Sequence, residues 1–206
     1  MVKINLNDCE YTEGRYPKEL LEYYQGNTDN YKQIKVGDIG GLTQFGVNKT
    51  VLPPKSATAM RHWHEEEDEF IFIISGSPTL VDKDGEHVMN SGDCATFKAG
   101  DKNGHAIVNK SEQDVVLLEV GTRAEKDIVH YTDKDLINVV DRTQTKQNTF
   151  KNLSGKIVFS IWFISFKYFW FEIINMKKIF LLFNLFFFLY FVFQLLVFTD
   201  EFVLSN

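Results

Sequence analysis

The chain has 206 residues, a formal net charge of −6 and only two cysteines. Its length suits one domain with residues to spare, and its acidic balance argues against a nucleic-acid partner held through phosphate neutralisation. Cys9 and Cys94 are too few for a disulfide framework, which favours a cytoplasmic location. The polar opening of the chain, residues 1–8, does not have the character of a secretory signal.

Residues 1–37 are mixed in character and are interpreted as an N-terminal extension. Within them, the pattern of residues 17–24 predicts a short helix that ends near Gly26.

Residues 38–136 are interpreted as one all-β domain. Short runs rich in β-branched and aromatic residues follow one another closely, and turn residues such as those of Asp82–Gly85 separate them. The predicted strands cover residues 45–52, 57–64, 69–75, 79–81, 86–89, 94–97, 105–109 and 115–120. Many short strands without alternating helices favour a sandwich or barrel over a parallel α/β sheet. From residue 127 to 149 the chain becomes polar, and we expect it to run over the barrel surface, with residues 137–156 as a polar linker.

Residues 157–206 form an apolar tail with 14 of the 19 phenylalanines. Residues 179–198 carry no formal charge and are long enough to cross a bilayer as a helix. Two lysines precede this run and two acidic residues follow it, which would keep the preceding domain cytoplasmic. A second interpretation is equally open: the tail is a frameshift or read-through artefact, because its residues are those that AT-rich codons specify. A membrane partner is expected only if the tail is genuine.

Three imidazoles and one carboxylate form the candidate metal site. His62 and His64 are two positions apart and therefore point to the same face of a strand. Glu69 lies an odd number of positions from His64, so residues 65–68 must bend before Glu69 begins the next strand. Glu67 and Asp68 are the alternative carboxylate ligands, and Glu69 ranks first because a regular strand places it on one face with Ile71 and Ile73. His105 completes the set. Imidazole with one carboxylate suits a divalent transition metal such as Fe, Mn, Ni or Zn.

These residues resemble the two motifs of the cupin superfamily. The first cupin motif is matched by His62-x-His64-x4-Glu69-x6-Gly76, except that Ser56 replaces its leading glycine. The second is matched from Gly92 through Gly100 and His105 to Asn109, with Lys98 for the proline and two extra residues before the histidine.

The likeness is stronger to uncharacterised bacterial single-domain cupins and covers about residues 38–136. It implies a double-stranded β-helix, or jelly-roll barrel, with a metal on His62, His64, Glu69 and His105, and often a homodimer. It does not supply a reaction, because many chemistries share this barrel.

Three functions stay open from the sequence, the third being a membrane-tethered metal-binding protein, which requires the apolar tail to be genuine. The first is a metal-dependent enzyme acting on a small organic substrate as an oxygenase, isomerase or hydrolase. The second is a non-catalytic module that binds or senses a small molecule. Around the site, Arg61 and Lys98 are candidates to hold an anionic substrate, although surface placement is favoured for both. The acidic run 65–68 is interpreted as a solvated turn, with an orienting partner for a ligand imidazole as the alternative.

Overall fold

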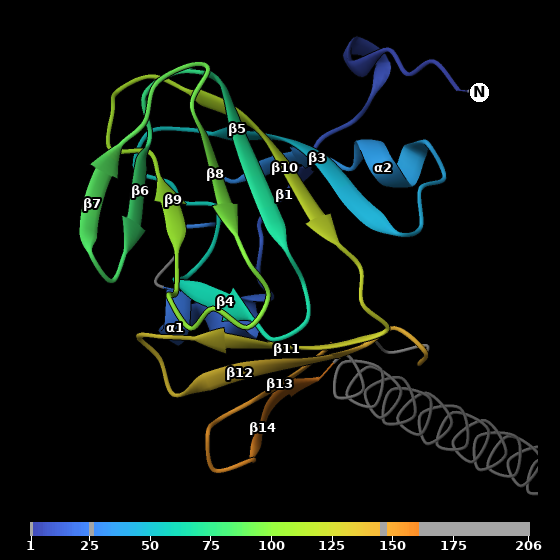
Figure 1. Ribbon diagram of the computed structural model, residues 1–206, viewed down its shortest axis with the longest axis vertical. Coiled ribbons are helices and arrows are strands. Elements are labelled where there is room, and N and C mark those ends of the chain that lie inside the picture. Colours follow the sequence, from blue (N-terminus) through green and yellow to red (C-terminus); the bar gives the residue numbers. More distant parts are fainter. Residues whose placement is uncertain (1, 25–26, 145–147, 161–206) are drawn as a thin grey trace, which may run out of the picture. The chain divides into compact units, whose positions relative to one another are not determined.

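A computed structural model of the chain describes residues 2–24, 27–144 and 148–160. Its body is built from antiparallel strands with a few short helices (Figure 1). The helical segments are η1 (Leu6–Asp8), η2 (Lys18–Leu20), α1 (Leu21–Tyr24) and α2 (Val36–Ile39). The predicted helix at residues 17–24 is therefore confirmed as two short consecutive turns, and the strands confirm the all-β class.

The larger sheet has six strands in the order β1-β2-β3-β10-β5-β8. Their bounds are β1 (Thr12–Glu13), β2 (Lys32–Ile34), β3 (Phe45–Leu52), β10 (Val115–Thr122), β5 (Glu69–Ser75) and β8 (Cys94–Phe97). Strand β10 is central and pairs over its whole length with β3. Its pairing with β5 places Gly121 opposite Glu69.

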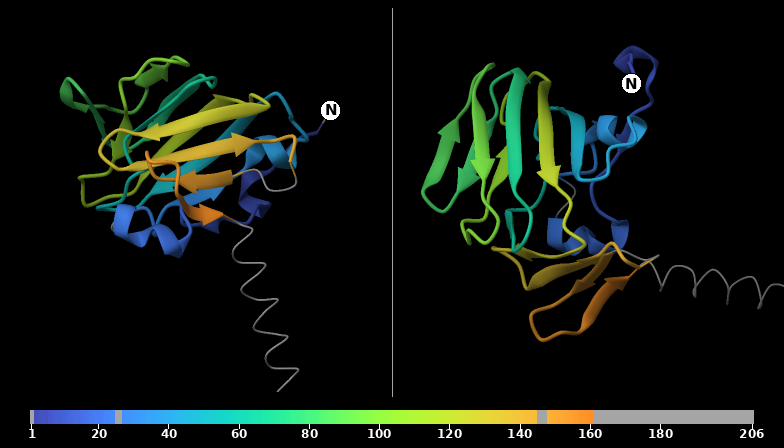
Figure 2. Two further views of the ribbon diagram at one scale, coloured as in Figure 1. Left: turned by 90° about the horizontal axis from the view of Figure 1, so that it is seen from below. Right: turned by 45° about the vertical axis from the view of Figure 1, so that its right-hand side comes forward.

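Two smaller sheets cover the other side of the barrel. One runs β14-β13-β12-β11-β4 and the other β7-β6-β9. Their strands are β4 (His62–His64), β6 (Thr79–Asp82), β7 (Gly85–Val88), β9 (Ala106–Val108), β11 (Lys126–Tyr131), β12 (Leu136–Asp141), β13 (Asn148–Lys151) and β14 (Ile157–Ser160). An isolated bridge between His62 and His105 joins the two sheets. Figure 2 shows β11 to β14 passing across one end of the larger sheet.

The inner face of the larger sheet changes in character along the barrel. At one end, which we call the apolar end, Leu52 pairs with Val115, and Leu117 pairs with Ile73. All four side chains are fully buried and belong to the hydrophobic core.

Further along the same inner face the side chains become polar, because strand residues two apart share a face. Asn48 pairs with Glu119, and the next inward pair is Gly46 with Gly121, beside Glu69. We call this region the polar end of the barrel. The two ends are less than a strand's length apart, and only the polar end carries the predicted metal ligands.

The expectation for residues 127–149 is wrong. Instead of a polar stretch running over the surface, residues 126–131 and 136–141 form the paired strands β11 and β12, and β13 continues the sheet from Asn148. The alternation of Leu136, Asn138 and Val140 as buried positions with half-buried neighbours explains why this segment forms a strand. The polar turns on either side concealed that alternation in the sequence.

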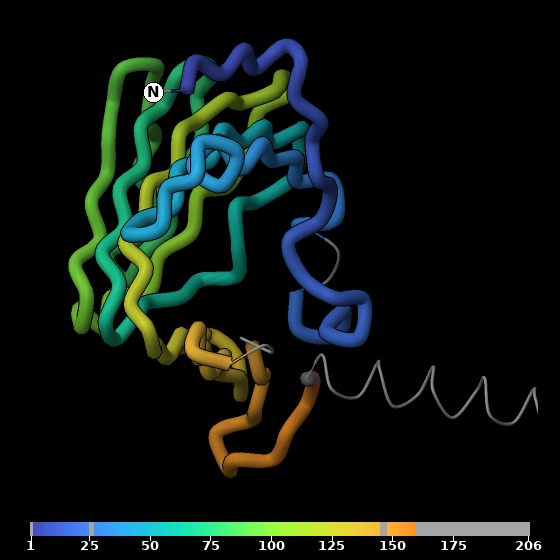
Figure 3. Tube along the Cα trace, turned by 90° about the vertical axis from the view of Figure 1, so that its right-hand side faces the viewer, coloured from blue at the N-terminus to red at the C-terminus, as the bar shows by residue number. Residues whose placement is uncertain are grey.

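The N-terminal segment is also part of the sheet. Strand β2 pairs with β3 and β1 pairs with β2, so these two N-terminal strands extend the larger sheet at its β3 edge. Figure 3 shows this segment, in blue, running along one side of the barrel.

The expected helical anchor lies almost wholly outside the described residues, which end at Ser160. The first residues of the apolar tail, 157–160, form β14. Within the part of the chain that the structure describes, no helix has the length and apolar character needed to span a membrane.

Candidate metal centre

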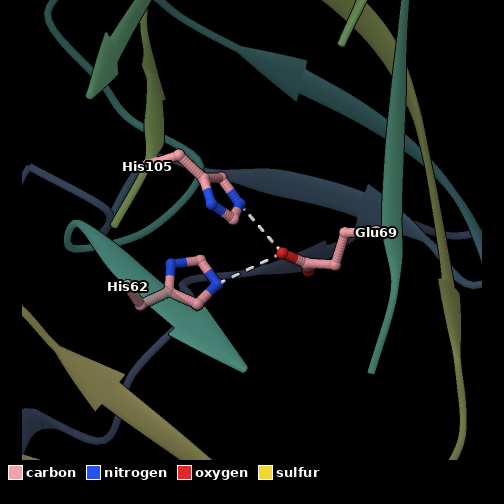
Figure 4. A group of neighbouring side chains, drawn as sticks. All are labelled: His62, Glu69 and His105. Carbon is pink, nitrogen blue, oxygen red and sulfur yellow. Dashed lines mark hydrogen bonds and ion pairs between the residues drawn. The ribbon is translucent and has the colours of Figure 1, made fainter. Parts of the chain in front are cut away.

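Three of the four predicted ligands meet at one point inside the barrel. Each of His62, Glu69 and His105 offers a ligand atom, and these atoms all lie within 4.8 Å of one another. Figure 4 shows both imidazoles directed at the Glu69 carboxylate. The Glu69 Oε2 atom lies 2.9 Å from His105 Nε2 and 3.6 Å from His62 Nε2.

The backbone explains why these three residues converge. His62 and His105 exchange two backbone hydrogen bonds across the bridge between their sheets, 3.1 Å and 2.9 Å long. Glu69 begins β5 on the opposite wall and shares its inward face with the buried Ile71 and Ile73. The chain bends between β4 and β5, as the odd spacing from His64 to Glu69 predicted.

His64 lies beside this group rather than within it. Its Nε2 atom is 3.7 Å from Glu69 Oε1, and the His62 and His64 rings are 5.1 Å apart between centroids. Within the described part of the chain, this buried Nε2 has no hydrogen-bond partner. A buried nitrogen without a partner is costly unless another group satisfies it, and a cation next to Glu69 would do so.

Hydrogen bonds fix which nitrogen faces the centre in two of the three imidazoles. His62 Nδ1 donates to the Met60 carbonyl at 2.9 Å, and His64 Nδ1 donates to Asp127 Oδ2 at 2.6 Å. In a neutral imidazole the other nitrogen then carries a lone pair, so both Nε2 atoms are prepared to bind a metal. The Asp127 side chain is fully buried and also accepts the Glu66 amide at 3.0 Å.

Sequence reasoning did not identify Asp127, because it lies 63 residues from His64 and inside a segment interpreted as surface chain. The acidic run was considered for this orienting role instead. Of its members, Glu67 comes within 3.9 Å of His64 Nδ1, but Arg142 and the Ala124 amide bind its carboxylate. Glu65 bonds to His130 on the outside of β4.

The charges of the cluster suit metal binding. Burial lowers the pKa of His62 to about 3, so this imidazole is neutral near pH 7. Burial also lowers the pKa of His64, but the hydrogen bond to Asp127 and the charge of Glu69 outweigh it and raise that pKa. Burial by itself raises the pKa of Glu69, yet the His105 hydrogen bond and the nearby imidazoles hold this pKa well below its ordinary value. An ionised carboxylate among imidazoles fits a divalent transition metal.

A cavity of about 300 Å³ opens onto this cluster. His64, Glu69 and His105 line it, together with Phe97, whose ring stacks on the His105 imidazole with centroids 3.4 Å apart. The volume is at the lower end of the range for small-molecule sites.

The two cations considered at the barrel mouth differ in their surroundings. Lys98 is exposed and lines the cavity. Arg61 is bound to Asp133 and to the Gly104 carbonyl, so its guanidinium is already engaged.

These observations define a small β-barrel protein with a histidine and carboxylate cluster inside the barrel. The sequence profile of the Cupin domain family matches residues 48–121. A crystal structure from Silicibacter pomeroyi DSS-3, described as a sugar phosphate isomerase from a cupin superfamily, is 38% identical and superimposes with a TM-score of 0.69. The match covers 75% of this chain and 95% of that chain. The chain belongs to the cupin superfamily.

A second crystal structure, from Acidithiobacillus ferrooxidans ATCC 23270, is 22% identical with a TM-score of 0.56, over 60% of this chain and 77% of that one. At this identity the likeness bears on the fold alone. No protein of curated function matches the chain.

Proposed function

We propose that this cupin is a metal-dependent isomerase of a phosphorylated sugar. The observation that carries the proposal is the convergence of ligand atoms of His62, Glu69 and His105 within 4.8 Å, beside a cavity that Glu69 and His105 line. The substrate class comes from the Silicibacter pomeroyi relative, which is described as a sugar phosphate isomerase and is 38% identical to this chain.

In this proposal His62, His64, Glu69 and His105 hold one divalent transition metal, with Fe, Mn, Ni and Zn as the candidates. The bound metal would act as a Lewis acid on a carbonyl or hydroxyl oxygen of the sugar. Asp127 and the Met60 carbonyl keep two imidazoles in the tautomer that presents Nε2, a role that orienting partners commonly have at metal sites. The cavity walls restrict the substrate to a small molecule.

The first test is metal content. His64→Ala should lose most of the bound metal while the barrel stays folded, because His64 is on a three-residue strand away from the apolar end. His87→Ala is the matched control, since His87 is half exposed and pairs with Asp82. Elemental analysis of anaerobically purified protein measures the stoichiometry. Unchanged metal content in His64→Ala would contradict the ligand assignment.

The second test is the reaction. Metal-loaded protein is incubated with a panel of aldose and ketose phosphates, and interconversion is followed by proton exchange in NMR. Turnover that disappears on chelation supports the isomerase. Tight binding of sugar phosphates without any turnover would instead favour a non-catalytic binding module.

The proposal also covers the cellular location and the oligomeric state of the protein. We infer a cytoplasmic enzyme from the two cysteines, which are both free, and a homodimer from the resemblance to single-domain cupins. Light scattering in solution tests the dimer.

A further inference from the structure

A second polar cluster lies inside the barrel, beyond the residues that both cupin motifs cover. Its members come from the N-terminal segment and from the inner faces of β2, β3 and β10. They are Arg15, Tyr31, Gln33, Thr50 and Glu119. A charged pair inside a barrel is expensive to bury and often marks a functional site.

The Glu119 carboxylate is held without help from Arg15. Its Oε2 atom accepts hydrogen bonds from Thr50 at 2.7 Å, from Tyr31 at 2.8 Å and from Gln33 at 3.3 Å. Its side chain is only 15% exposed. Three donors on one oxygen fix this carboxylate firmly.

By contrast, most N–H donors of the Arg15 guanidinium make no hydrogen bond within the described residues. Nη1 donates to the Tyr31 hydroxyl at 3.2 Å and lies 3.9 Å from Glu119 Oε1, too far for a hydrogen bond. Within residues 2–24, 27–144 and 148–160, this is the only hydrogen bond recorded for a side chain that carries five N–H donors. The side chain is 29% exposed, so the unused donors are not sealed in the core.

Strand register places Glu119, the ion-pair partner of Arg15, close to the metal centre. Glu119 and Gly121 are on the same inner face of β10, and Gly121 pairs with Glu69. Two strand residues span roughly 7 Å. Glu119, the partner of Arg15, therefore lies about this distance along β10 from the residue that pairs with Glu69. The positive charge of Arg15 also acts on His62, where it adds to the effect of burial in lowering the pKa.

Tyr16, the neighbour of Arg15 in the sequence, connects the N-terminal segment to the metal centre through a hydrogen bond. The Tyr16 hydroxyl accepts the Met60 amide at 3.2 Å, and the Met60 carbonyl accepts His62 Nδ1. The Tyr16 ring also packs edge-on against Tyr131, which lies beside His62. Arg15 is therefore carried by a segment that contacts the backbone next to a proposed metal ligand.

Two glycines of the larger sheet lie in the same row as Glu69. Gly46 and Gly121 pair there and contribute no side chains. A Cβ at Gly121 would lie 3.8 Å from the Glu69 side chain, and one at Gly46 would lie 3.6 Å from the Arg123 guanidinium. Side chains larger than alanine at either position would fill the space beside these charged groups.

We propose that Arg15 is the residue that binds the anionic group of the substrate, a phosphate monoester, next to the metal centre. Guanidinium groups bind phosphate through paired N–H donors. Within the described residues, Arg15 uses only one of its donors, in the hydrogen bond to Tyr31. The identity of the anion rests on the proposed function. The Tyr31 hydroxyl positions the guanidinium, and the N-terminal segment thereby becomes part of the substrate site.

The experiment measures binding of inorganic phosphate to the metal-loaded full-length protein by calorimetry. Arg15→Gln should weaken binding at least tenfold without changing the metal content, and Arg15→Lys should fall between this variant and the wild type. Lys32→Gln is the matched control, because Lys32 is a half-exposed cation of the same region that pairs with Glu13. It should bind phosphate as the wild type does.

Two further variants keep the test decisive. Glu119→Gln retains Arg15 and removes the competing negative charge, so it should bind phosphate at least as tightly as the wild type. The double variant Arg15→Gln with Glu119→Gln leaves no unpaired charge inside the barrel, and it should fold but fail to bind phosphate. Wild-type affinity in either variant that lacks Arg15, or no phosphate binding by the wild type, would overturn the inference.

The outcome is separable from that of the proposed function. Phosphate binding that depends on Arg15 in a protein without isomerase turnover would refute the isomerase and leave the anion site standing. Sugar phosphate turnover with an unchanged KM in Arg15→Gln would refute the anion site at Arg15 and leave the isomerase standing.

Discussion

The apolar and polar ends of the barrel interior are built on the same strands, yet they serve different purposes. At the apolar end, Leu52, Val115, Leu117 and Ile73 are fully buried and make the core. At the polar end, the inward positions of β3, β10 and β5 include Asn48, Glu119 and Glu69, and two glycines share the row of Glu69. The hydrophobic core and the proposed metal ligands are thus separated along each strand by only a few residues, so stability and metal binding should respond separately to substitution.

The largest expected effect is on the apolar end. Ile73→Ala should reduce the free energy of unfolding by about 2–5 kcal/mol, because it leaves a cavity among close-packed neighbours, and it should leave metal content unchanged. Phe72→Ala, which removes an exposed ring on the outer face of the same strand, should cost far less. Urea denaturation and elemental analysis test both variants. If Ile73→Ala loses metal as readily as stability, the two ends are not independent.

The next effect concerns the polar end. Asp127→Asn should weaken metal affinity by about 10–100-fold, which corresponds to roughly 1.4–2.8 kcal/mol, because the amide no longer fixes the charge and tautomer of His64. Asp133→Asn changes an exposed carboxylate that pairs with Arg61 and should have no effect. Competition with a metal chelator measures the affinities. Equal affinity in the two variants would remove Asp127 from the metal site.

The smallest expected effect is a pH dependence of the metal-free protein. The pKa of His62 is lowered by burial to about 3, so the unfolded chain binds a proton below pH 6.5 that folded His62 does not. The His62 contribution to stability is therefore present above pH 6.5 and is lost as the pH falls toward 3. Between pH 7 and 5.5 the loss amounts to about 1 kcal/mol.

His64 opposes this trend, because its raised pKa favours the folded state below pH 6.5 and loses that benefit as the pH rises. The comparison of wild type with His62→Gln isolates the His62 part, and His87→Gln serves as the control. Unfolding curves in urea at pH 7.0 and 5.5 supply the numbers. The same pH slope in wild type and His62→Gln would show that His62 is not the source.

The sequence predicted the barrel and the convergence of His62, Glu69 and His105 because these signals are local. Alternation along a strand and the spacing of a motif depend on neighbouring residues. The bend before Glu69 was predicted in the same way, from its odd spacing. The structure also places His64 next to Glu69, and its role as a fourth ligand stays a prediction.

What the sequence did not show depends on contacts between distant segments. Asp127 orients His64 from a strand that pairs with β4, and Tyr16 reaches Met60 from the N-terminal segment. Neither residue belongs to either of the two cupin motifs. Glu119 belongs to a strand that was predicted, but its hydrogen bonds to Tyr31 and Thr50 depend on how β2 and β3 pair. Such partners follow only from the three-dimensional register.

The flat contact between Phe97 and His105 has a consequence for kinetics. A phenyl ring lying parallel against an imidazole restricts rotation of that imidazole about its Cβ–Cγ bond. A half-turn about this bond would exchange Nε2 with Cε1, so the stacked ring keeps Nε2 directed at Glu69 before any ion binds. Loading should accordingly be a single fast phase, without a slow rearrangement of this side chain.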